Sequence, residues 1–236
     1  MSAKKGRAPK PPSVEERRRA ATILKRLAKA YPDWGPTLRF SNPFELLVAT
    51  ILAAQASDES VNRVTSDLFK KYPDPHAYVN APQAELERDV HSLGFFRQKA
   101  KAVKAMSAGV LERFGGVVPR DVEPLTELRG VGRKTASIVV GAAYGTPSIG
   151  VDRHVARVSQ RLGFTRQGDP DKIELDVAAR FNKKDWVKAT WCLVLHGRRI
   201  CTPTPRCYEC PVRDLCPYPH KTKAPAEVRG RARVPA

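Results

Sequence analysis

Four of the five cysteines in this chain fall within sixteen residues, in the order Cys201-x5-Cys207-x2-Cys210-x5-Cys216. No secretory signal is found, because the first twenty residues are basic and contain no apolar stretch. A disulfide framework formed after export is therefore not expected. Four thiols held this closely in a reducing compartment indicate a metal site, wrapped by a single loop.

The spacing of these thiols distinguishes two kinds of metal site. Zinc ribbons pair two Cys-x2-Cys knuckles across a longer spacer, and only Cys207 and Cys210 form such a pair here. Four thiolates wrapped in one loop suit a cubane iron–sulfur cluster better, with zinc as the alternative. The remaining cysteine, Cys192, lies in the apolar stretch WCLVLH and is interpreted as a core residue.

The net charge of this chain is unusual and indicates the kind of partner that it binds. Its 42 Lys and Arg against 24 Asp and Glu give a net charge of +18 and a pI near 10.0. Such a surplus indicates a polyanionic partner, nucleic acid before membrane. No run approaches the roughly 18 apolar residues of a membrane-spanning helix. We therefore expect a cytoplasmic, nucleoid-associated protein that is neither secreted nor bound to a membrane.

Both ends are basic, and residues 1–20 and 219–236 are expected to be disordered arms. Between them the apolar pattern is helical. Asn42 and Pro43 are typical of a helix start, and the run 44–55 is apolar on nearly every side, as in a helix buried at the centre of a bundle. Helical spacing continues to residue 195 without sustained two-residue alternation, which predicts an all-α fold.

The segment LRGVGRKTA contains two glycines, Gly130 and Gly132, between a short helix and a longer one. Glycine permits positive φ and lets backbone N–H groups approach an anion closely, so this turn predicts a phosphate-binding hairpin. Arg133 and Lys134 begin the longer helix, where the macrodipole disfavours cations. An amine in that position is a candidate nucleophile, and a phosphate contact is the simpler alternative.

A second candidate for chemistry is the segment VDRHV, downstream of the hairpin. Asp152 is a typical N-cap, and this structural role is the simpler interpretation. A carboxylate at a helix start also keeps a fixed orientation, which suits a catalytic group facing Lys134.

Together and in this order, these motifs resemble endonuclease III, the iron–sulfur DNA glycosylase and AP lyase of the helix-hairpin-helix superfamily. The resemblance covers residues 25–217 and includes LLVATILAAQASDESVNRVT, GVGRKTA, VDRHV, LHGR and the cysteine loop. Two departures are visible. Arg129 replaces the proline that is usual in the family hairpin, and the first cysteine gap is five residues instead of six.

The resemblance implies a bifunctional enzyme of base excision repair that removes oxidised pyrimidines from duplex DNA. It makes Lys134 the nucleophile that forms a Schiff base with the sugar and Asp152 the second catalytic group, with strand nicking by β-elimination. It also implies a 4Fe-4S cluster on Cys201, Cys207, Cys210 and Cys216. The partner is double-stranded DNA with damaged bases or abasic sites, and we expect a monomer.

Further DNA contacts follow from the same resemblance. Gln55 matches the residue that fills the gap left by the flipped base, and Phe95 stands where the family often has a leucine wedge. The alternative interpretation of Gln55 is a polar residue that ends the buried helix. The alternative interpretation of Phe95 is a residue anchored in the core, with Phe96 outside. His154 is expected near the DNA backbone or as a structural histidine, and Arg206 on a phosphate-facing edge. Gly130, Gly132 and Arg133 complete the expected DNA-binding set.

The implied architecture is two domains with an active-site cleft between them. Residues 36–147 form a six-helix barrel with the helix-hairpin-helix, and residues 21–35 with 148–218 form the cluster domain. Adenine and mismatch thymine glycosylases of the superfamily usually lack a lysine at position 134, so Lys134 favours a lyase. The alternatives from other classes are a catalytically silent DNA-binding protein and a zinc-stabilised DNA-binding module.

Overall fold

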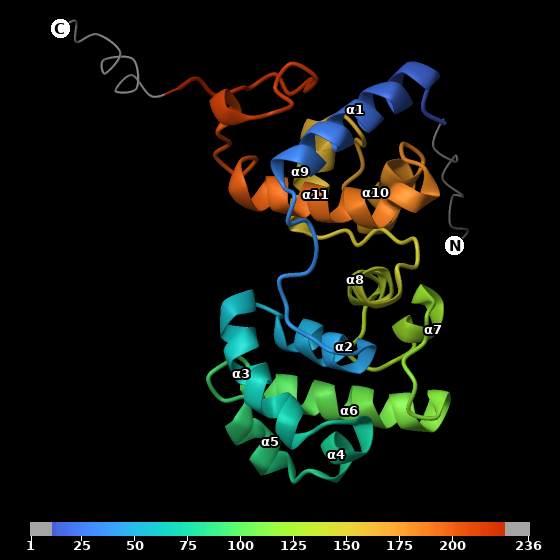
Figure 1. The fold of residues 1–236 in the computed structure, drawn as a ribbon, viewed down its shortest axis with the longest axis vertical. Helices are drawn as coiled ribbons and strands as arrows, with labels where there is room; N and C mark the ends of the chain where they lie inside the picture. The colour runs from blue at the N-terminus through green and yellow to red at the C-terminus, as the bar shows by residue number, and fades with distance from the viewer. Residues whose placement is uncertain (1–10, 225–236) are drawn as a thin grey trace, which may run out of the picture. The chain divides into compact units, whose positions relative to one another are not determined.

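The computed structural model describes residues 11–224, and these residues form helices, turns and loops with no strand, which confirms the all-α fold class (Figure 1). The chain divides into two compact units. One runs from Gly35 to Gly150, and the other combines the chain up to Trp34 with the chain from Val151 onward. No helix among the described residues is long and apolar enough to cross a membrane.

The unit of residues 35–150 contains α2(Pro43–Leu52), α3(Asp58–Lys71), α4(Pro75–Asn80), α5(Gln83–Asp89), α6(Phe96–Phe114), α7(Val122–Thr126) and α8(Arg133–Tyr144). At its centre, α2 packs against α3, α6 and α8. The expected helix start is confirmed, because Asn42 accepts a hydrogen bond from the Glu45 N–H at 2.9 Å and Pro43 occupies the first turn. Leu46, Leu47 and most of the residues that follow in α2 are completely buried.

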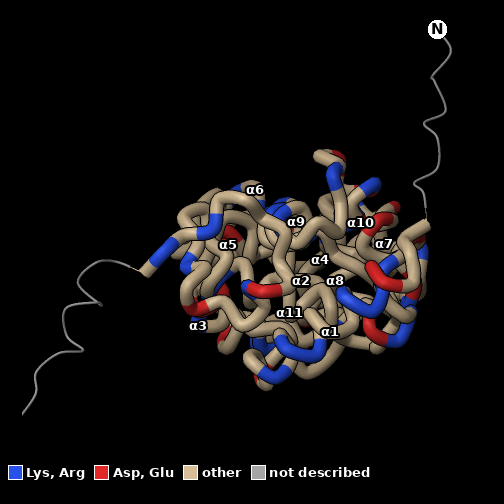
Figure 2. The backbone as a smooth tube through the Cα atoms, turned by 90° about the horizontal axis from the view of Figure 1, so that it is seen from above, with Lys and Arg blue, Asp and Glu red and all other residues tan. Residues whose placement is uncertain are grey.

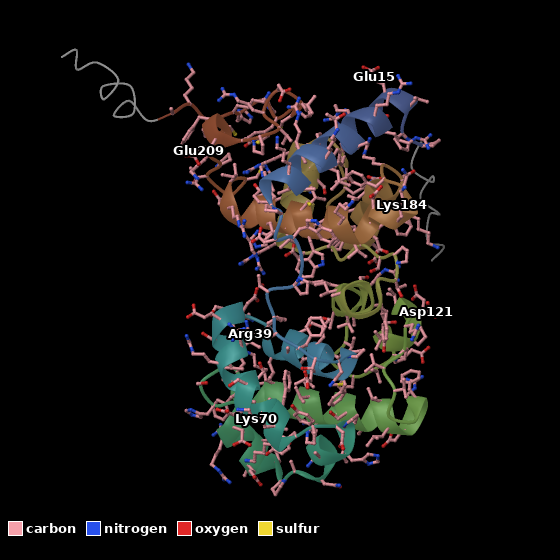
Figure 3. All side chains as sticks on the ribbon, viewed as in Figure 1. Glu15, Arg39, Lys70, Asp121, Lys184 and Glu209 are labelled. Carbon is pink, nitrogen blue, oxygen red and sulfur yellow. The ribbon has the colours of Figure 1, made fainter. Side chains whose placement is uncertain are left out.

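Helix α4 begins with Asp74 and Pro75, which give the same N-cap and first-turn signal that marks α2. Helix α5 stops at Asp89, and a turn carries the chain on to Gly94. Side chains fill the spaces between the helices of this unit (Figure 3).

The other unit contains α1(Val14–Ala30), α9(Arg153–Arg161), α10(Pro170–Ala178), α11(Trp186–Arg199) and the 3-10 turns η1(Lys183–Asp185) and η2(Cys207–Glu209). Helix α11 packs against both α1 and α9. Beyond α11 the chain has little regular structure, and this segment holds the four clustered cysteines.

The expectation of disorder up to residue 20 is wrong for its second half. Ser13 and Glu16 form a capping box that starts α1 at Val14, and Ala20 is completely buried. The carboxyl-terminal boundary at 219 is also too early, because the Thr222 hydroxyl accepts from the Cys207 N–H at 2.9 Å and donates to the Pro205 carbonyl at 2.6 Å. Residues 1–10 and 225–236 of the expected arms lie outside the described residues.

Basic residues are spread along the backbone of the described chain and are not confined to one helix (Figure 2). Several of them form exposed ion pairs, such as Arg63 with Glu59 on α3 and Arg199 with Asp33. Exposed pairs of this kind contribute little to stability. The Lys and Arg residues of the described chain are therefore distributed over both units.

The burial of α2 predicts a large effect of truncation there. Leu46→Ala should lower the free energy of unfolding by about 2–5 kcal/mol, because the lost methyl groups leave a cavity in a close-packed core. Urea denaturation followed by circular dichroism measures this loss. Leu175→Ala, at a leucine that is 58% exposed on α10, is the control and should change stability by less than about 0.5 kcal/mol. Equal effects of the two variants would contradict the central position of α2.

Candidate functional site

The turn between α7 and α8 is a tight hairpin built on backbone geometry. Val131 is 4% exposed, and its N–H donates to the Leu128 carbonyl at 3.0 Å. Gly130 has φ +84°, and a Cβ atom there would lie 3.4 Å from Ala102 of α6. This left-handed conformation confirms the expected need for glycine at Gly130. Arg129, which replaces the family proline, is exposed and leaves the turn intact.

The backbone conformation does not require glycine at Gly132, the other hairpin glycine. Gly132 is the N-cap of α8 with φ −86°, which any residue adopts, and nothing lies within 4 Å of a Cβ built on it. No side chain caps the first N–H groups of α8 at Gly132, and uncapped N–H groups at a helix start are the arrangement that binds an anion. Arg133 and the exposed Lys134 occupy the first turn of the same helix, and Arg133 donates to Glu123 of α7 at 2.8 Å.

Gln55 and Phe95 share a conformation that sets them apart. They are the non-glycine residues of the described chain with positive φ, +55° and +58° respectively. Such backbone strain costs about 1–3 kcal/mol and is concentrated at functional sites. Gln55 lies exposed in the turn after α2, and Phe95 directly precedes α6.

The structure also decides between the two interpretations of Phe95. Its side chain is 59% exposed, whereas Phe96 is partly buried against the core of its unit. The core-anchor alternative for Phe95 is therefore wrong. An aromatic ring held in solvent on a strained turn is available to contact a partner.

Asp152 lies in the other unit and caps α9, so its expected structural role is confirmed. Its Oδ1 atom accepts from the N–H groups of His154 at 2.8 Å and Val155 at 2.7 Å. Because both bonds use one oxygen, the carboxylate is held in a fixed orientation while Oδ2 takes no part in the cap.

His154 is half-buried at the contact of α9 with α11. Its Nδ1 atom lies 3.1 Å from Arg157, and a Cβ atom on Gly197 would lie only 2.8 Å from the Cβ of His154. Burial lowers the pKa of His154. Arg157 also donates to the carbonyls of Gly197 at 2.9 Å and Cys201 at 3.0 Å. His154 therefore takes part in the packing between the two helices and keeps part of its surface exposed.

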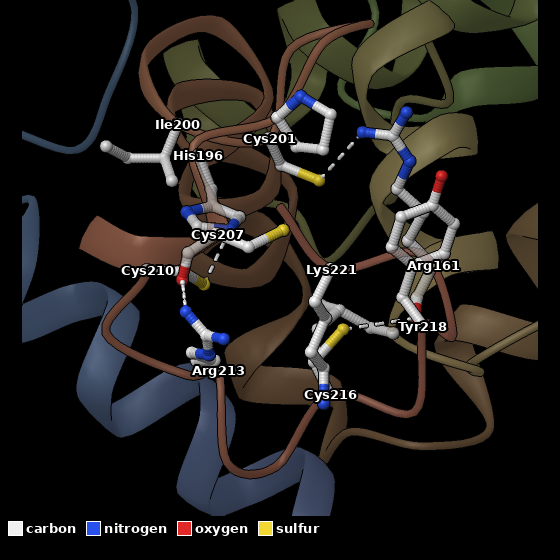
Figure 4. Close-up of a pocket in the computed structure, with 12 residues that line it drawn as sticks. Arg161, His196, Ile200, Cys201, Cys207, Cys210, Arg213, Cys216, Tyr218 and Lys221 are labelled. Carbon is white, nitrogen blue, oxygen red and sulfur yellow. Dashed lines mark hydrogen bonds between the residues drawn. The ribbon is translucent and has the colours of Figure 1, made fainter. Parts of the chain in front are cut away.

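The four clustered cysteines line one pocket (Figure 4). The shorter first gap still lets both Cys201 and Cys207 reach it. Among the described residues, no three His, Cys, Asp or Glu side chains converge closely enough to hold a single metal ion. Burial raises the pKa of Cys210 to about 11, and it raises the pKa of Cys216 as well.

Arginine side chains hold the loop that carries these thiols. Arg161 of α9 donates to the Thr202 and Pro203 carbonyls at 2.6 and 3.0 Å and to the Cys201 sulfur at 3.4 Å. Arg19 of α1 donates to the Leu215 carbonyl at 2.9 Å.

Arg26 and Arg206 also make contacts in the loop. Arg26 of α1 pairs with Asp214 at 2.7 Å. Arg206, expected on a phosphate-facing edge, is exposed but donates to the Arg199 carbonyl at 2.6 Å and pairs with Glu209 at 3.2 Å.

Sequence reasoning missed Arg19, Arg26 and Arg161, and it also missed His196, which lies in the same pocket as the cysteines. Their partners are far away along the chain. Arg19 and Leu215, for example, are 196 residues apart. No local sequence pattern predicts such a pair, so it can be identified only from the tertiary structure.

Comparison with known proteins gives the family. Residues 48–183 match the model described as "HhH-GPD superfamily base excision DNA repair protein". The chain is 45% identical to endonuclease III of Bacillus subtilis, over 82% of this chain and 89% of that protein. It is 36% identical to endonuclease III of Escherichia coli, over 84% of this chain and 95% of that protein. The chain belongs to the endonuclease III family.

Solved structures agree with this membership. A trapped endonuclease III–DNA covalent intermediate is 40% identical, with a TM-score of 0.80 over 92% of this chain and 99% of that one. A thermostable thymine-DNA glycosylase is 25% identical with a TM-score of 0.77, over 88% of this chain and 98% of that one. The endonuclease III homologue described here is thus a DNA glycosylase and AP lyase of base excision repair, and its partner is DNA.

The two hairpin glycines predict different outcomes for the same substitution. Gly130→Ala forces a methyl group into a left-handed conformation and should destabilise the protein by about 1–2 kcal/mol. Gly132→Ala meets no protein atom, so it should cost less stability but weaken binding to duplex DNA, since its methyl group occupies the space that a phosphate enters. Urea denaturation and fluorescence anisotropy with a labelled duplex measure the two effects. Unchanged affinity of Gly132→Ala would show that the phosphate is held elsewhere.

Proposed function

We propose that Lys134 is the nucleophile and Asp152 the second catalytic group in the excision of oxidised pyrimidines from duplex DNA. The observation that carries this proposal is the position of Lys134, exposed on the first turn of α8 beside N–H groups that suit a DNA phosphate. A phosphate bound there fixes the sugar next to the amine. The 40% identical relative, solved as a covalent intermediate with DNA, supports covalent chemistry.

The chain itself tethers the two catalytic groups. The segment before Asp152 packs on α8, where the Ser148 hydroxyl donates to the Ser137 carbonyl at 2.7 Å and a Cβ on Gly150 would lie 3.6 Å from the Lys134 carbonyl. Only Val151 separates Gly150 from Asp152. Consecutive Cα atoms are about 3.8 Å apart, so Asp152 follows Gly150 by about two such steps along the chain.

In the proposed reaction the damaged nucleotide is flipped out of the duplex. The Lys134 amine attacks C1′ of the sugar, the bond to the base breaks, and the base leaves with the electron pair. Asp152 stabilises the positive charge that develops on the sugar. The C1′–O4′ bond of the resulting aminal then breaks, with O4′ taking up the proton lost by the amine, and the open-chain Schiff base between the amine and C1′ acidifies the C2′ proton. Loss of that proton expels the 3′ phosphate and nicks the strand by β-elimination.

Gln55 and Phe95 are proposed to enter the duplex around the lesion. An exposed aromatic ring such as Phe95 can wedge between base steps, and an amide such as Gln55 can fill the gap left by the flipped base. The positive φ of both residues supports this role, because strain of this kind is kept where the surrounding fold must present a side chain outward. Gly130, Gly132, Arg133, His154 and Arg206 form the proposed contacts to the DNA backbone.

The proposed cofactor is a 4Fe-4S cluster held by Cys201, Cys207, Cys210 and Cys216. The donor set fits, because all four thiols line one pocket without converging on a point. A single zinc ion at Zn–S distances of about 2.3 Å requires that convergence, so the arrangement favours the larger cluster over zinc. When bound, the cluster supplies a rigid cross-link of the loop and a redox-active group, and excision itself transfers no electrons.

Because the substrate is chromosomal DNA, we place the protein in the cytoplasm at the nucleoid.

Borohydride trapping tests the proposed nucleophile. On a duplex with one thymine glycol, the wild-type protein should give a covalent adduct, and Lys134→Gln should lower adduct formation by at least about a thousandfold because no Schiff base can form. Lys172→Gln, at an exposed lysine of α10, is the matched control and should react normally. Base release without any adduct in the wild type would overturn the lyase mechanism. A duplex with an abasic site in the same gel separates a wrong lesion from an inactive protein.

Metal analysis tests the proposed cofactor. Cys210→Ala should lose the iron and acid-labile sulfide that the wild-type protein carries, because it removes one ligand from the pocket. Cys192→Ala should retain both, since the Cys192 thiol is completely buried within α11 and lies outside the pocket lining. Zinc in place of iron in the wild-type protein would contradict the proposal.

A further inference from the structure

His196 connects the cysteine pocket to a tyrosine on another helix. It lies in the last turn of α11 and is 2% exposed. Its Nε2 atom lies 3.6 Å from the Cys210 sulfur, as the dashed line in Figure 4 shows, and its Nδ1 atom lies 2.8 Å from the hydroxyl of Tyr31. Tyr31 ends α1 and is 4% exposed. The three side chains thus form a buried row that ends at one proposed cluster ligand.

The chemistry of the two partners sets the direction of both hydrogen bonds. A cysteine that ligates a metal is a thiolate, and a thiolate has no proton to donate. The hydrogen between His196 and Cys210 must therefore be on Nε2, which leaves Nδ1 of the neutral ring as an acceptor. The Tyr31 hydroxyl is the donor that Nδ1 requires. The tyrosine consequently selects the tautomer that donates to the sulfur.

We propose that Tyr31 and His196 act as a relay that delivers an N–H hydrogen bond to the Cys210 thiolate and so raises the reduction potential of the cluster. The inference rests on the proposed cluster. A hydrogen bond to a ligand sulfur stabilises negative charge there, and the reduced cluster carries one more negative charge than the oxidised one. The bond should therefore favour the reduced form.

The surroundings strengthen this relay. The imidazole and the phenol are both buried, and a hydrogen bond in a low-dielectric interior is electrostatically stronger than one in water. The Arg199 guanidinium lies 5.4 Å from the centre of the Tyr31 ring and pairs with Asp33, which restrains the end of α1. Cys201 receives a separate donor, Arg161 of α9, at 3.4 Å. Two ligands thus receive donors from two different helices.

Two substitutions separate the relay from the packing. His196→Phe keeps an aromatic ring but removes the donor, and Tyr31→Phe removes only the hydroxyl that selects the tautomer. Tyr78→Phe is the control for loss of a buried hydroxyl, since Tyr78 is completely buried in the other unit and its hydroxyl has no hydrogen-bond partner within the described structure. Cys192→Ala is the control for a change inside α11. Each protein is purified whole, and its iron and sulfide are quantified first.

Two measurements on the loaded proteins then test the proposal. Voltammetry should give a more negative cluster potential for His196→Phe and a smaller shift in the same direction for Tyr31→Phe, with both controls at the wild-type potential. Resonance Raman spectra should show that exchange into deuterium oxide shifts the iron–thiolate bands of the wild type, and that His196→Phe loses part of this isotope shift. We expect the remaining isotope shift to come from the hydrogen bond that Arg161 donates to the Cys201 sulfur.

The outcomes that overturn the proposal are distinct. A normal iron content with wild-type potential and isotope shift in His196→Phe shows that the ring only packs against the loop. If His196→Phe does not assemble a cluster, Tyr31→Phe decides, and an unchanged potential in that variant overturns the relay. A wild-type protein without iron overturns the proposed cofactor and the relay with it, which the first assay reveals before any variant is compared.

Discussion

The loop that carries the four clustered cysteines depends on hydrogen bonds from arginine to backbone carbonyl groups. A segment with almost no regular structure leaves its carbonyls without the partners that a helix would provide, and buried polar groups need such partners. Arg19 of α1 and Arg157 of α9 each donate to one carbonyl of the loop, and Arg161 of α9 donates to two. The position of the thiols therefore follows from the helices around the loop.

This use of arginine changes the meaning of the net charge of +18. A guanidinium group that donates to carbonyls inside the protein still contributes to the long-range field that attracts DNA, but it is not free to bind a phosphate directly. Arg161 illustrates the difference, because its guanidinium donates to the Thr202 and Pro203 carbonyls. Direct contact with DNA is left to backbone amides and to side chains such as Lys134.

In the unit of residues 35–150, the proposed DNA-binding features are mainly properties of the backbone. Gly130 and Gly132 shape the hairpin, and Gln55 and Phe95 stand on turns with positive φ. All four positions adjoin helices that pack on the central α2 or its neighbours. An apolar core thus supports exposed turns, and this division suits the proposed insertion of Gln55 and Phe95 into the duplex.

The sequence by itself determined the all-α class, the hairpin at Gly130 and Gly132, the buried helix α2 and the cysteine set, because each has a local signature in spacing, capping or hydrophobic pattern. The start of α1 was available in the same way, from the capping box of Ser13 and Glu16, although the surrounding charge obscured it. Only the tertiary structure decided that Phe95 is exposed and Phe96 partly buried, since adjacent aromatic residues give the same pattern. It alone placed Tyr31 beside His196, 165 residues away, because a pair that meets through the packing of α1 on α11 leaves no periodic trace in the chain.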